Sequence, residues 1–209
     1  MGVEELVSAL VSGGLLKSKR VIGAFRTVPR ENFVPDGLKS LAYSDSPLPI
    51  PSGQTISAPH MVAVMTERLD VKGGQKILEI GTGSGYQAAV LSVLNQKGKI
   101  YTVEVVPELF NFARENLKSY KNVLVFSSDG SIGLPEYAPY DRIIVTAGAP
   151  NVPKAWPEQL KENGKIIAPV GGMYEQRLML VEKKKGKITE TDLNFPCVFV
   201  PLRGLYGWK

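Results

Sequence analysis

One stretch limits the possible folds more than any other: an apolar segment followed at once by three glycines in five residues. Residues 77–80, Ile-Leu-Glu-Ile, are typical of a short buried strand, and residues 86–94 are apolar enough to form a helix. Glycine permits positive φ and lets a ligand approach the backbone closely. The stretch therefore indicates either a site for a nucleotide-like cofactor or merely a tight turn between strand and helix.

The composition is that of an ordinary globular protein. With 209 residues, 44% hydrophobic and 22% charged, the chain is expected to form a single domain over residues 1–209. The net charge of +5 permits a nucleic acid or an acidic substrate without requiring either. One cysteine, Cys197, excludes an internal disulfide and fits a reducing compartment. No apolar run could span a membrane, so we expect a cytoplasmic protein that does not bind membranes. We also expect it to be a monomer and not to bind nucleic acid.

The first 60 residues show no clear strand pattern. Residues 4–12 and 19–27 each have the spacing of an amphipathic helix, and prolines follow the second one. We therefore expect residues 1–60 to form a helical extension that includes the segment just ahead of the core. Residues 61–209 are expected to form the α/β core itself.

Strands and helices alternate through the core. The predicted strands are 77–80, 100–103, 123–126, 140–147, 165–170, 176–182 and 198–202, and the predicted helices are 61–69, 86–94, 107–117 and 153–160. Residues 183–187, which are rich in lysine, are expected to form a hairpin turn. This alternation predicts a doubly wound, mostly parallel Rossmann-like α/β sheet with helices on both faces.

An acidic residue follows each of the next two predicted strands after the glycine turn. Glu104 ends the second strand, where a carboxylate can bind a ribose diol or can simply be solvated. Asp129 and Gly130 follow the third strand, although Asp-Gly is also ordinary turn chemistry. Because the carboxyl ends of parallel strands share one edge of a sheet, we expect both acids to lie near the glycines.

The glycine turn, Glu104 and Asp129 together fit S-adenosyl-L-methionine better than a dinucleotide. Its ribose is a diol, its adenine amino group is a hydrogen-bond donor, and it has no pyrophosphate, so the full dinucleotide glycine motif is unnecessary. The order of the glycine turn, Glu104 and Asp129 resembles the class I S-adenosylmethionine-dependent methyltransferases. This resemblance implies S-adenosyl-L-methionine as cofactor and S-adenosyl-L-homocysteine as product.

The segment after the fourth predicted strand bears on the methyl acceptor. Residues 146–150, Thr-Ala-Gly-Ala-Pro, lack the asparagine and aromatic residue with which base-methylating enzymes typically hold a neutral nitrogen. A carboxylate is already ionised at neutral pH and needs no general base. The sequence therefore favours a carboxylate acceptor, for which alignment and desolvation would be the main contributions of the protein.

Residues 53–61, Gly-Gln-Thr-Ile-Ser-Ala-Pro-His-Met, stand just ahead of the glycine stretch and resemble the protein-L-isoaspartate (D-aspartate) O-methyltransferases. The similarity continues through residues 128–130, 138–141 and 145–147 and ends at 199–202. It implies methyl transfer to the free α-carboxylate of L-isoaspartyl residues in damaged proteins and peptides. The methyl ester then forms a succinimide and partly returns to aspartyl, so the implied role is protein repair.

The resemblance also implies a set of site residues. Ser57 would be the catalytic residue, donating a hydrogen bond to the acceptor carboxylate rather than acting as a covalent nucleophile. Ser57 would also bind substrate together with Val200, Pro201 and Leu202. The cofactor would contact Gln54, Thr55, Ile56, Gly81, Thr82, Gly83, Gly85, Glu104, Val105, Asp129 and Gly130.

Other interpretations stay open. Ser57 stands where it could instead cap the helix predicted to follow it, and His60 is expected to be structural. Arg203 is left outside the predicted site. A single histidine and a single cysteine cannot form a zinc cluster, so no metal is expected. The net charge and the lysines at 183–185 leave an RNA methyltransferase as one alternative, and a non-catalytic S-adenosylmethionine-binding module is another.

Overall fold

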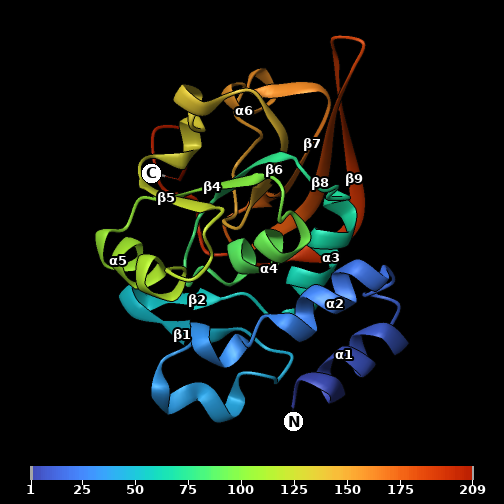
Figure 1. Ribbon diagram of the computed structural model, residues 1–209. Coiled ribbons are helices and arrows are strands. Elements are labelled where there is room, and N and C mark those ends of the chain that lie inside the picture. Colours follow the sequence, from blue (N-terminus) through green and yellow to red (C-terminus); the bar gives the residue numbers. More distant parts are fainter. Residues whose placement is uncertain (1, 209) are drawn as a thin grey trace.

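A computed structural model describes residues 2–208, which are organised around one seven-stranded sheet with the strand order β5-β4-β3-β6-β7-β8-β9 (Figure 1). Neighbouring strands from β5 through β7 are parallel, whereas β8 and β9 are antiparallel. The strands are β3 (Lys76–Ile80), β4 (Lys99–Glu104), β5 (Val123–Ser127), β6 (Tyr140–Val145), β7 (Leu160–Gly172), β8 (Glu175–Lys184) and β9 (Lys187–Cys197). The predicted doubly wound, mostly parallel α/β fold is confirmed.

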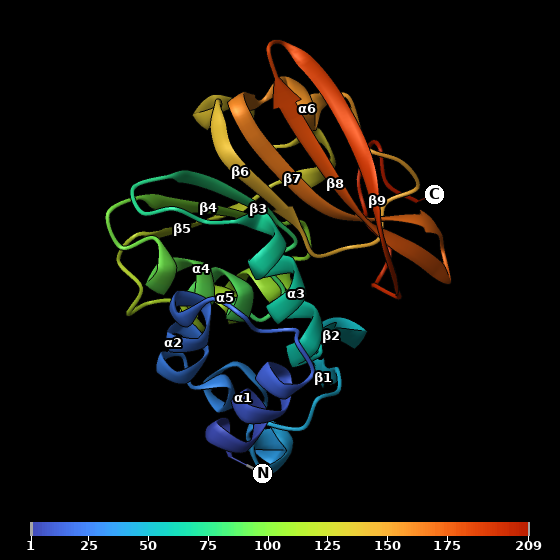
Figure 2. The ribbon, with the colours of Figure 1, turned by 90° about the vertical axis from the view of Figure 1, so that its right-hand side faces the viewer.

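Helices cover the two faces of the sheet unequally. Figure 2 shows α3, α4 and α5 directly below the sheet, α1 and α2 as a further layer beneath them, and the short α6 on the opposite face. The α-helices are α1 (Val3–Ser12), α2 (Lys19–Thr27), α3 (Pro59–Leu69), α4 (Tyr86–Leu94), α5 (Pro107–Asn116) and α6 (Ala155–Glu158). The 3-10 turns are η1 (Arg30–Phe33), η2 (Asp36–Leu41), η3 (Pro51–Gly53), η4 (Gly130–Ile132) and η5 (Pro135–Tyr137). No helix within residues 2–208 is long and apolar enough to cross a membrane.

The central position of β3 in the sheet explains why the sequence of this strand is almost continuously apolar. Ile77 packs with α3, α4 and α5 on one face of the sheet, whereas Leu78 and Ile80 pack with Trp156 on the other. Each of these side chains is at most 1% exposed. Since both faces of a parallel strand are covered, alternation of apolar and polar residues is absent from such a strand.

The N-terminal layer is joined to the core by a buried arginine. Arg30 is fully buried, its Nε donates to the carbonyl of Ala42 at 2.8 Å, and its guanidinium lies 5.0 Å from the ring centre of Tyr86 at the start of α4. Burial lowers the pKa of Arg30 to about 10. Its two terminal nitrogens have no hydrogen-bond partner in the described part of the chain. The cation–π contact is therefore its main link to the core.

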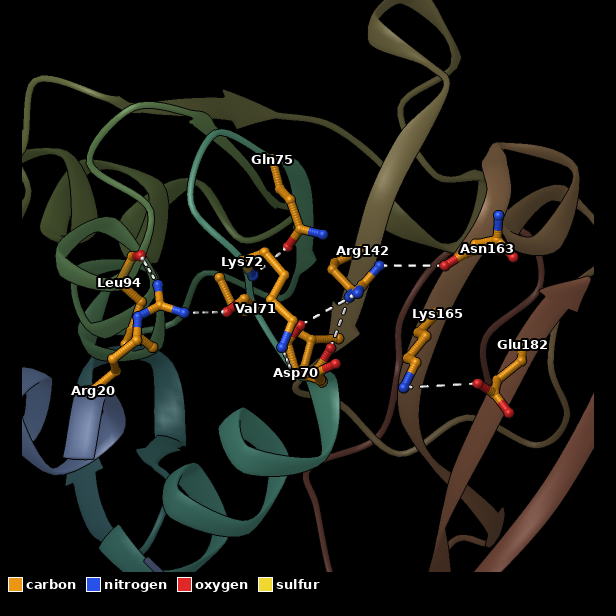
Figure 3. Close-up of polar contacts among 11 residues, drawn as sticks. Arg20, Asp70, Val71, Lys72, Gln75, Leu94, Arg142, Asn163, Lys165 and Glu182 are labelled. Atoms are coloured by element: carbon orange, nitrogen blue, oxygen red, sulfur yellow. Dashed lines mark hydrogen bonds and ion pairs between the residues drawn. The ribbon is translucent and has the colours of Figure 1, made fainter. Parts of the chain in front are cut away.

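At the edge of the sheet opposite the glycine turn, two arginines hold helix C-termini (Figure 3). Arg142 on β6 donates from Nε to the carbonyl of Leu69 at 2.8 Å, at the end of α3. Arg20 on α2 donates to the carbonyls of Val71 and Leu94 at 2.9 and 2.8 Å. The last carbonyls of a helix lack partners within the helix and carry partial negative charge, so a guanidinium both satisfies and stabilises them.

Three local predictions are wrong. Residues 198–202 form no strand beyond a single bridge between Pro201 and Gly148, and the last strand is instead β9. The sequence of β9 does not predict a strand, because most of its side chains are exposed and it lacks the apolar alternation of a half-buried strand. A small hairpin of β1 (Leu48–Ile50) and β2 (Gln54–Ile56) lies in the proline-rich segment, where no strand is expected. The helix predicted at 153–160 shortens to α6.

Glu79 lies in the middle of β3, where it is fully buried. Burial, which opposes its ionisation, is the main cause that raises the pKa of this carboxyl from its ordinary value of 4.5 to about 8; the nearby Glu104 contributes to the rise, and the hydrogen bond from Thr102 opposes it. The folded protein thus holds a proton on Glu79 at neutral pH that the unfolded chain releases. This contribution to stability is complete below pH 4.5 and is lost as the pH rises towards 8.

We predict that Glu79→Gln removes this pH dependence, because glutamine is neutral at every pH. Between about pH 5.5 and about pH 7.5 the variant should gain on the order of 1.4 kcal/mol per pH unit in free energy of unfolding relative to wild type. Urea unfolding at both pH values measures this. The exposed Glu115→Gln serves as control and should follow wild type. Parallel pH curves for wild type and Glu79→Gln would contradict the prediction.

Candidate active site

A pocket opens at the carboxyl ends of β3 and β4, beside the point where the strand order reverses between β4 and β6. Its empty space, including the open mouth, is about 890 Å³, which is ample for a nucleoside-sized ligand. The predicted site residues that line it are Gln54, Thr55, Ile56, Ser57, Gly81, Thr82, Gly83, Glu104, Val105, Gly130, Val200, Pro201 and Leu202. Two predicted residues, Gly85 and Asp129, are not part of its lining.

The glycine turn is held against the end of β4. The N–H groups of Gly81 and Thr82 both donate to the carbonyl of Val103, at 2.9 and 3.1 Å. Gly81 has φ +92°, and a Cβ atom there would lie 2.7 Å from Oγ1 of Thr146. Only glycine fits this combination of positive φ and close packing. The turn therefore exposes bare backbone to the pocket.

Gly85 lies outside the pocket lining and packs closely at the start of α4. It precedes α4 with φ +89°, and a Cβ atom would lie 2.8 Å from Cγ of Leu117. The glycine therefore allows α4 to begin close to the residue that follows α5. It shapes the turn from behind rather than facing the pocket.

The carboxylate of Glu104 is fixed by backbone amides. Oε2 accepts from the N–H of Gly83 at 2.9 Å, and Oε1 accepts from Val105 and Val106 at 2.9 and 3.0 Å. The residue is 5% exposed and lines the pocket. Each carboxylate oxygen retains acceptor capacity beyond these bonds. Glu104 is thus a rigid acceptor that suits the diol of a ribose.

A second acid, Glu79, enters the pocket from β3. Its Oε2 accepts from Oγ1 of Thr102 at 2.5 Å, and Thr102 in turn lies 2.7 Å from Oγ1 of Thr82. Oε1 of Glu79 has no hydrogen-bond partner among residues 2–208. Since buried polar atoms normally have partners, this oxygen indicates a place for a polar group of a bound molecule.

Gly130 and Asp129 differ in what they face. A Cβ atom at Gly130 would lie 2.6 Å from Cγ2 of Ile80, so the glycine forms a tightly packed floor of the pocket. The carboxylate of Asp129 accepts from the N–H groups of Ser131 and Leu205, each at 2.8 Å. Asp129 therefore holds the C-terminal tail to the loop after β5.

Ser57 lies between two hollows. The helix after it begins with Ala58 as its N-terminal cap residue and no side-chain cap bond, so the alternative of Ser57 as the cap of α3 is wrong. The hydroxyl of Ser57 has no hydrogen-bond partner within residues 2–208. Ser57 lines both the cofactor-sized pocket and a second hollow on its other side. Its hydroxyl is thus free to donate to a ligand in either space.

The C-terminal segment closes the pocket from the side of β6. The carbonyl of Val200 accepts from the N–H of Gly148, and the N–H of Leu202 donates to the carbonyl of Gly148, each at 2.8 Å. These bonds bring residues 200–202 beside the loop that follows β6. Arg203 continues the lining and makes no hydrogen bond or ion pair in the described chain.

Several lining residues were missed from the sequence, above all Glu79, Thr146 and Arg203. Glu79 has a signal, because it is the acid within the strand that leads into the glycine turn. Thr146 directly follows β6, whose carboxyl end shares the edge with β3. Arg203 has no local signal, since only its long-range bridge to Gly148 brings the tail here. Three or more side chains that could hold a metal together do not occur in residues 2–208.

The pocket fits the cofactor predicted from the sequence. Bare backbone at the glycine turn permits close approach, Glu104 offers acceptors for a ribose diol, and the unpaired Oε1 of Glu79 leaves one further polar contact for a ligand.

Comparisons with known proteins agree with this geometry. The family model described as Protein-L-isoaspartate(D-aspartate) O-methyltransferase matches residues 1–206. The chain is 52% identical to a protein-L-isoaspartate O-methyltransferase of Hyperthermus butylicus, over 98% of this chain and 89% of that protein. It is equally identical, 52%, to one of Methanopyrus kandleri, over 99% of this chain and 93% of that protein.

A solved structure is similar over the whole chain. It is a crystal structure from Plasmodium falciparum, described as a protein-L-isoaspartate O-methyltransferase in complex with S-adenosyl-L-homocysteine. It superposes with a TM-score of 0.87 at 30% identity, covering 97% of this chain and 99% of that one. The matched family model, the relatives at half identity and this structural likeness lead to one conclusion: the chain belongs to the protein-L-isoaspartate (D-aspartate) O-methyltransferase family.

Proposed function

We propose that this protein methylates the free α-carboxylate of L-isoaspartyl residues in damaged proteins and peptides, with S-adenosyl-L-methionine as methyl donor. The methyl ester leads through a succinimide back to aspartyl, so the reaction begins a repair. The observation that carries the proposal is the position of Ser57, whose unpartnered hydroxyl lines both the cofactor-sized pocket and the hollow beside it. Family membership supports the same activity.

Different pocket residues contact different parts of the cofactor in this proposal. S-adenosyl-L-methionine supplies a methyl group activated by a positively charged sulfur. We assign the ribose to the amide-held carboxylate of Glu104 and the adenine end to Asp129 and Gly130. The turn at 81–83 and residues 54–56 and 105 provide the surrounding backbone and side-chain walls. Glu79 lines the pocket, and its unpaired oxygen leaves one further polar contact for the cofactor.

Ser57 acts in this scheme by orienting the acceptor. One carboxylate oxygen bonds to the methyl carbon as the carbon–sulfur bond breaks, and no proton has to move. The hydroxyl of Ser57 donates to the acceptor carboxylate and fixes its direction of attack, while Val200, Pro201 and Leu202 bound the cleft. Such alignment, together with exclusion of water, is the main source of rate for a reactant that is already ionised.

The remaining expectations concern the setting of the enzyme. We propose that it works in the cytoplasm as a monomer, on isoaspartyl peptides and proteins, without nucleic acid, membrane or metal. Lys183 and Lys184 end β8 and Lys185 lies in the turn before β9; none of them lines the pocket, so they give no support to RNA as the methyl acceptor. Methyl incorporation into paired isoaspartyl and aspartyl peptides, with RNA as a third acceptor, tests the proposed activity directly.

Glu104→Ala should weaken cofactor binding because it removes the acceptor for the ribose. The expected loss is roughly 1.5–3 kcal/mol, the range for a hydrogen bond to a charged group. Calorimetric titration with S-adenosyl-L-homocysteine measures it, and the exposed Glu115→Ala serves as control. Unchanged affinity in Glu104→Ala would refute the assignment.

Ser57→Ala should lower kcat on the order of 10²-fold, because a misaligned acceptor attacks poorly. Cofactor affinity should change less than in Glu104→Ala, and Ser57→Thr should keep part of the activity. Single-turnover methyl transfer to an isoaspartyl peptide separates the three proteins. A wild-type rate in Ser57→Ala would remove the serine from the mechanism, and a covalent adduct found by mass spectrometry would overturn direct transfer.

Asp129→Ala should weaken binding of both S-adenosylmethionine and S-adenosylhomocysteine. If the carboxylate contacts the adenine amino group, wild type prefers S-adenosylhomocysteine to S-inosylhomocysteine, which lacks that group, and the variant loses this preference. Binding titrations with both ligands test this. An equal loss for both ligands would instead mean that Asp129 acts by holding the C-terminal tail at Leu205.

A further inference from the structure

Arg30 is fully buried, yet its guanidinium is incompletely hydrogen-bonded. Its Nε donates to the carbonyl of Ala42 at 2.8 Å, but Nη1 and Nη2 have no hydrogen-bond partner within residues 2–208. Burying a charge whose donors stay unpaired costs free energy. Apolar side chains of similar volume often replace buried charges without loss of stability. Stability of the fold alone therefore does not explain an arginine at this position.

The guanidinium lies over an aromatic ring that belongs to the cofactor-sized pocket. Cζ of Arg30 is 5.0 Å from the ring centre of Tyr86, a distance at which the ring face attracts a cation. Tyr86 directly follows the glycine turn, is 2% exposed and lines the pocket. Arg30 itself lines neither the pocket nor the hollow beside it. An effect of Arg30 on a bound cofactor would thus pass through Tyr86.

Two further side chains of the N-terminal layer hold the same ring. Phe33 in η1 and Phe25 in α2 meet the ring of Tyr86 edge to face, with ring centres 5.5 and 6.3 Å away. Such pairs are favourable and directional. The hydroxyl of Tyr86 makes no hydrogen bond within residues 2–208. The contacts with Arg30 and the two phenylalanines therefore set the orientation of this ring.

We propose that Arg30 is a positioning residue for the cofactor, because it fixes the ring of Tyr86 in the pocket wall. Cofactor affinity then depends on the N-terminal layer, although none of residues 2–53 lines the pocket. The inference rests on the proposed function only in taking this pocket as the cofactor site. It also explains the unpaired guanidinium, since natural chains break local rules of stability mainly at functional sites.

Calorimetric titration with S-adenosyl-L-homocysteine tests the proposal on wild type, Arg30→Met and Arg30→Lys. Methionine fills similar space without a charge, so Kd should rise about fivefold in Arg30→Met, the effect of one lost cation–π contact. Arg30→Lys keeps a cation and should lose less affinity. It carries the comparison if Arg30→Met does not fold. The exposed Arg26→Met, in the same layer, is the matched control and should bind as wild type.

Double variants separate positioning of the ring from a general effect on the fold. The rise in Kd caused by Arg30→Met should persist in a Tyr86→Phe background, which keeps the ring. It should disappear in Tyr86→Leu, which has no ring to position. A structural role alone predicts the same fold-change in Kd in every background, because it does not act through Tyr86.

The outcomes for this inference and for the proposed function are distinguishable. Wild-type Kd in Arg30→Met, or an equal fold-change in both Tyr86 backgrounds, would overturn the inference while a loss of affinity in Glu104→Ala still supports the pocket as the cofactor site. Unchanged Kd in Glu104→Ala as well would overturn the placement of the cofactor itself. Wild type that binds S-adenosyl-L-homocysteine but methylates no isoaspartyl peptide would overturn only the proposed activity.

Discussion

The site depends on one carboxylate and the three backbone amides that hold it. Glu104 accepts from Gly83 in the glycine turn and from Val105 and Val106 ahead of α5, so it ties the ends of two neighbouring strands into one rigid corner. A carboxylate at a helix N-terminus is stabilised by the partial positive charge there. The same bonds that fix this carboxylate also hold the turn open for a ligand. Folding and ligand recognition thus use one set of interactions.

Two other buried groups are left incompletely paired. Oε1 of Glu79 and the terminal nitrogens of Arg30 have no hydrogen-bond partners in the described residues. Leaving buried polar groups unpaired costs free energy in the empty protein. Glu79 lines the pocket, where a bound ligand can supply the missing partner. Arg30 instead contacts the ring of Tyr86 and joins the N-terminal layer to the helix that follows the glycine turn.

Much of the fold was predictable because its signals are local. The boundaries of α2 and α4 match the predicted helices, since amphipathic spacing and the glycine turn mark them within a few residues. The family prediction is confirmed by the comparisons, and it rested on a contiguous string around Ser57. The strand predicted at residues 198–202 is wrong. A run with β-branched residues favours a strand, but this segment pairs with the rest of the structure only through one bridge to Gly148. The division of the chain at residue 60 and the individual roles of the site residues stay predictions.

The sequence by itself determined the parallel core of the sheet, the cofactor edge and the family, because the signals for each lie within short segments of the chain; it did not determine the edge strand β9. Only the tertiary structure decided which residues surround the second hollow beside Ser57. His60 follows Ser57 by three positions, yet its place in the hollow depends on Asp45, on the loop after β6 and on residues 196–200. Asp129 holds the tail at Leu205 for the same reason. Hydrogen bonds between distant segments fix these arrangements, and no spacing within a single segment encodes them.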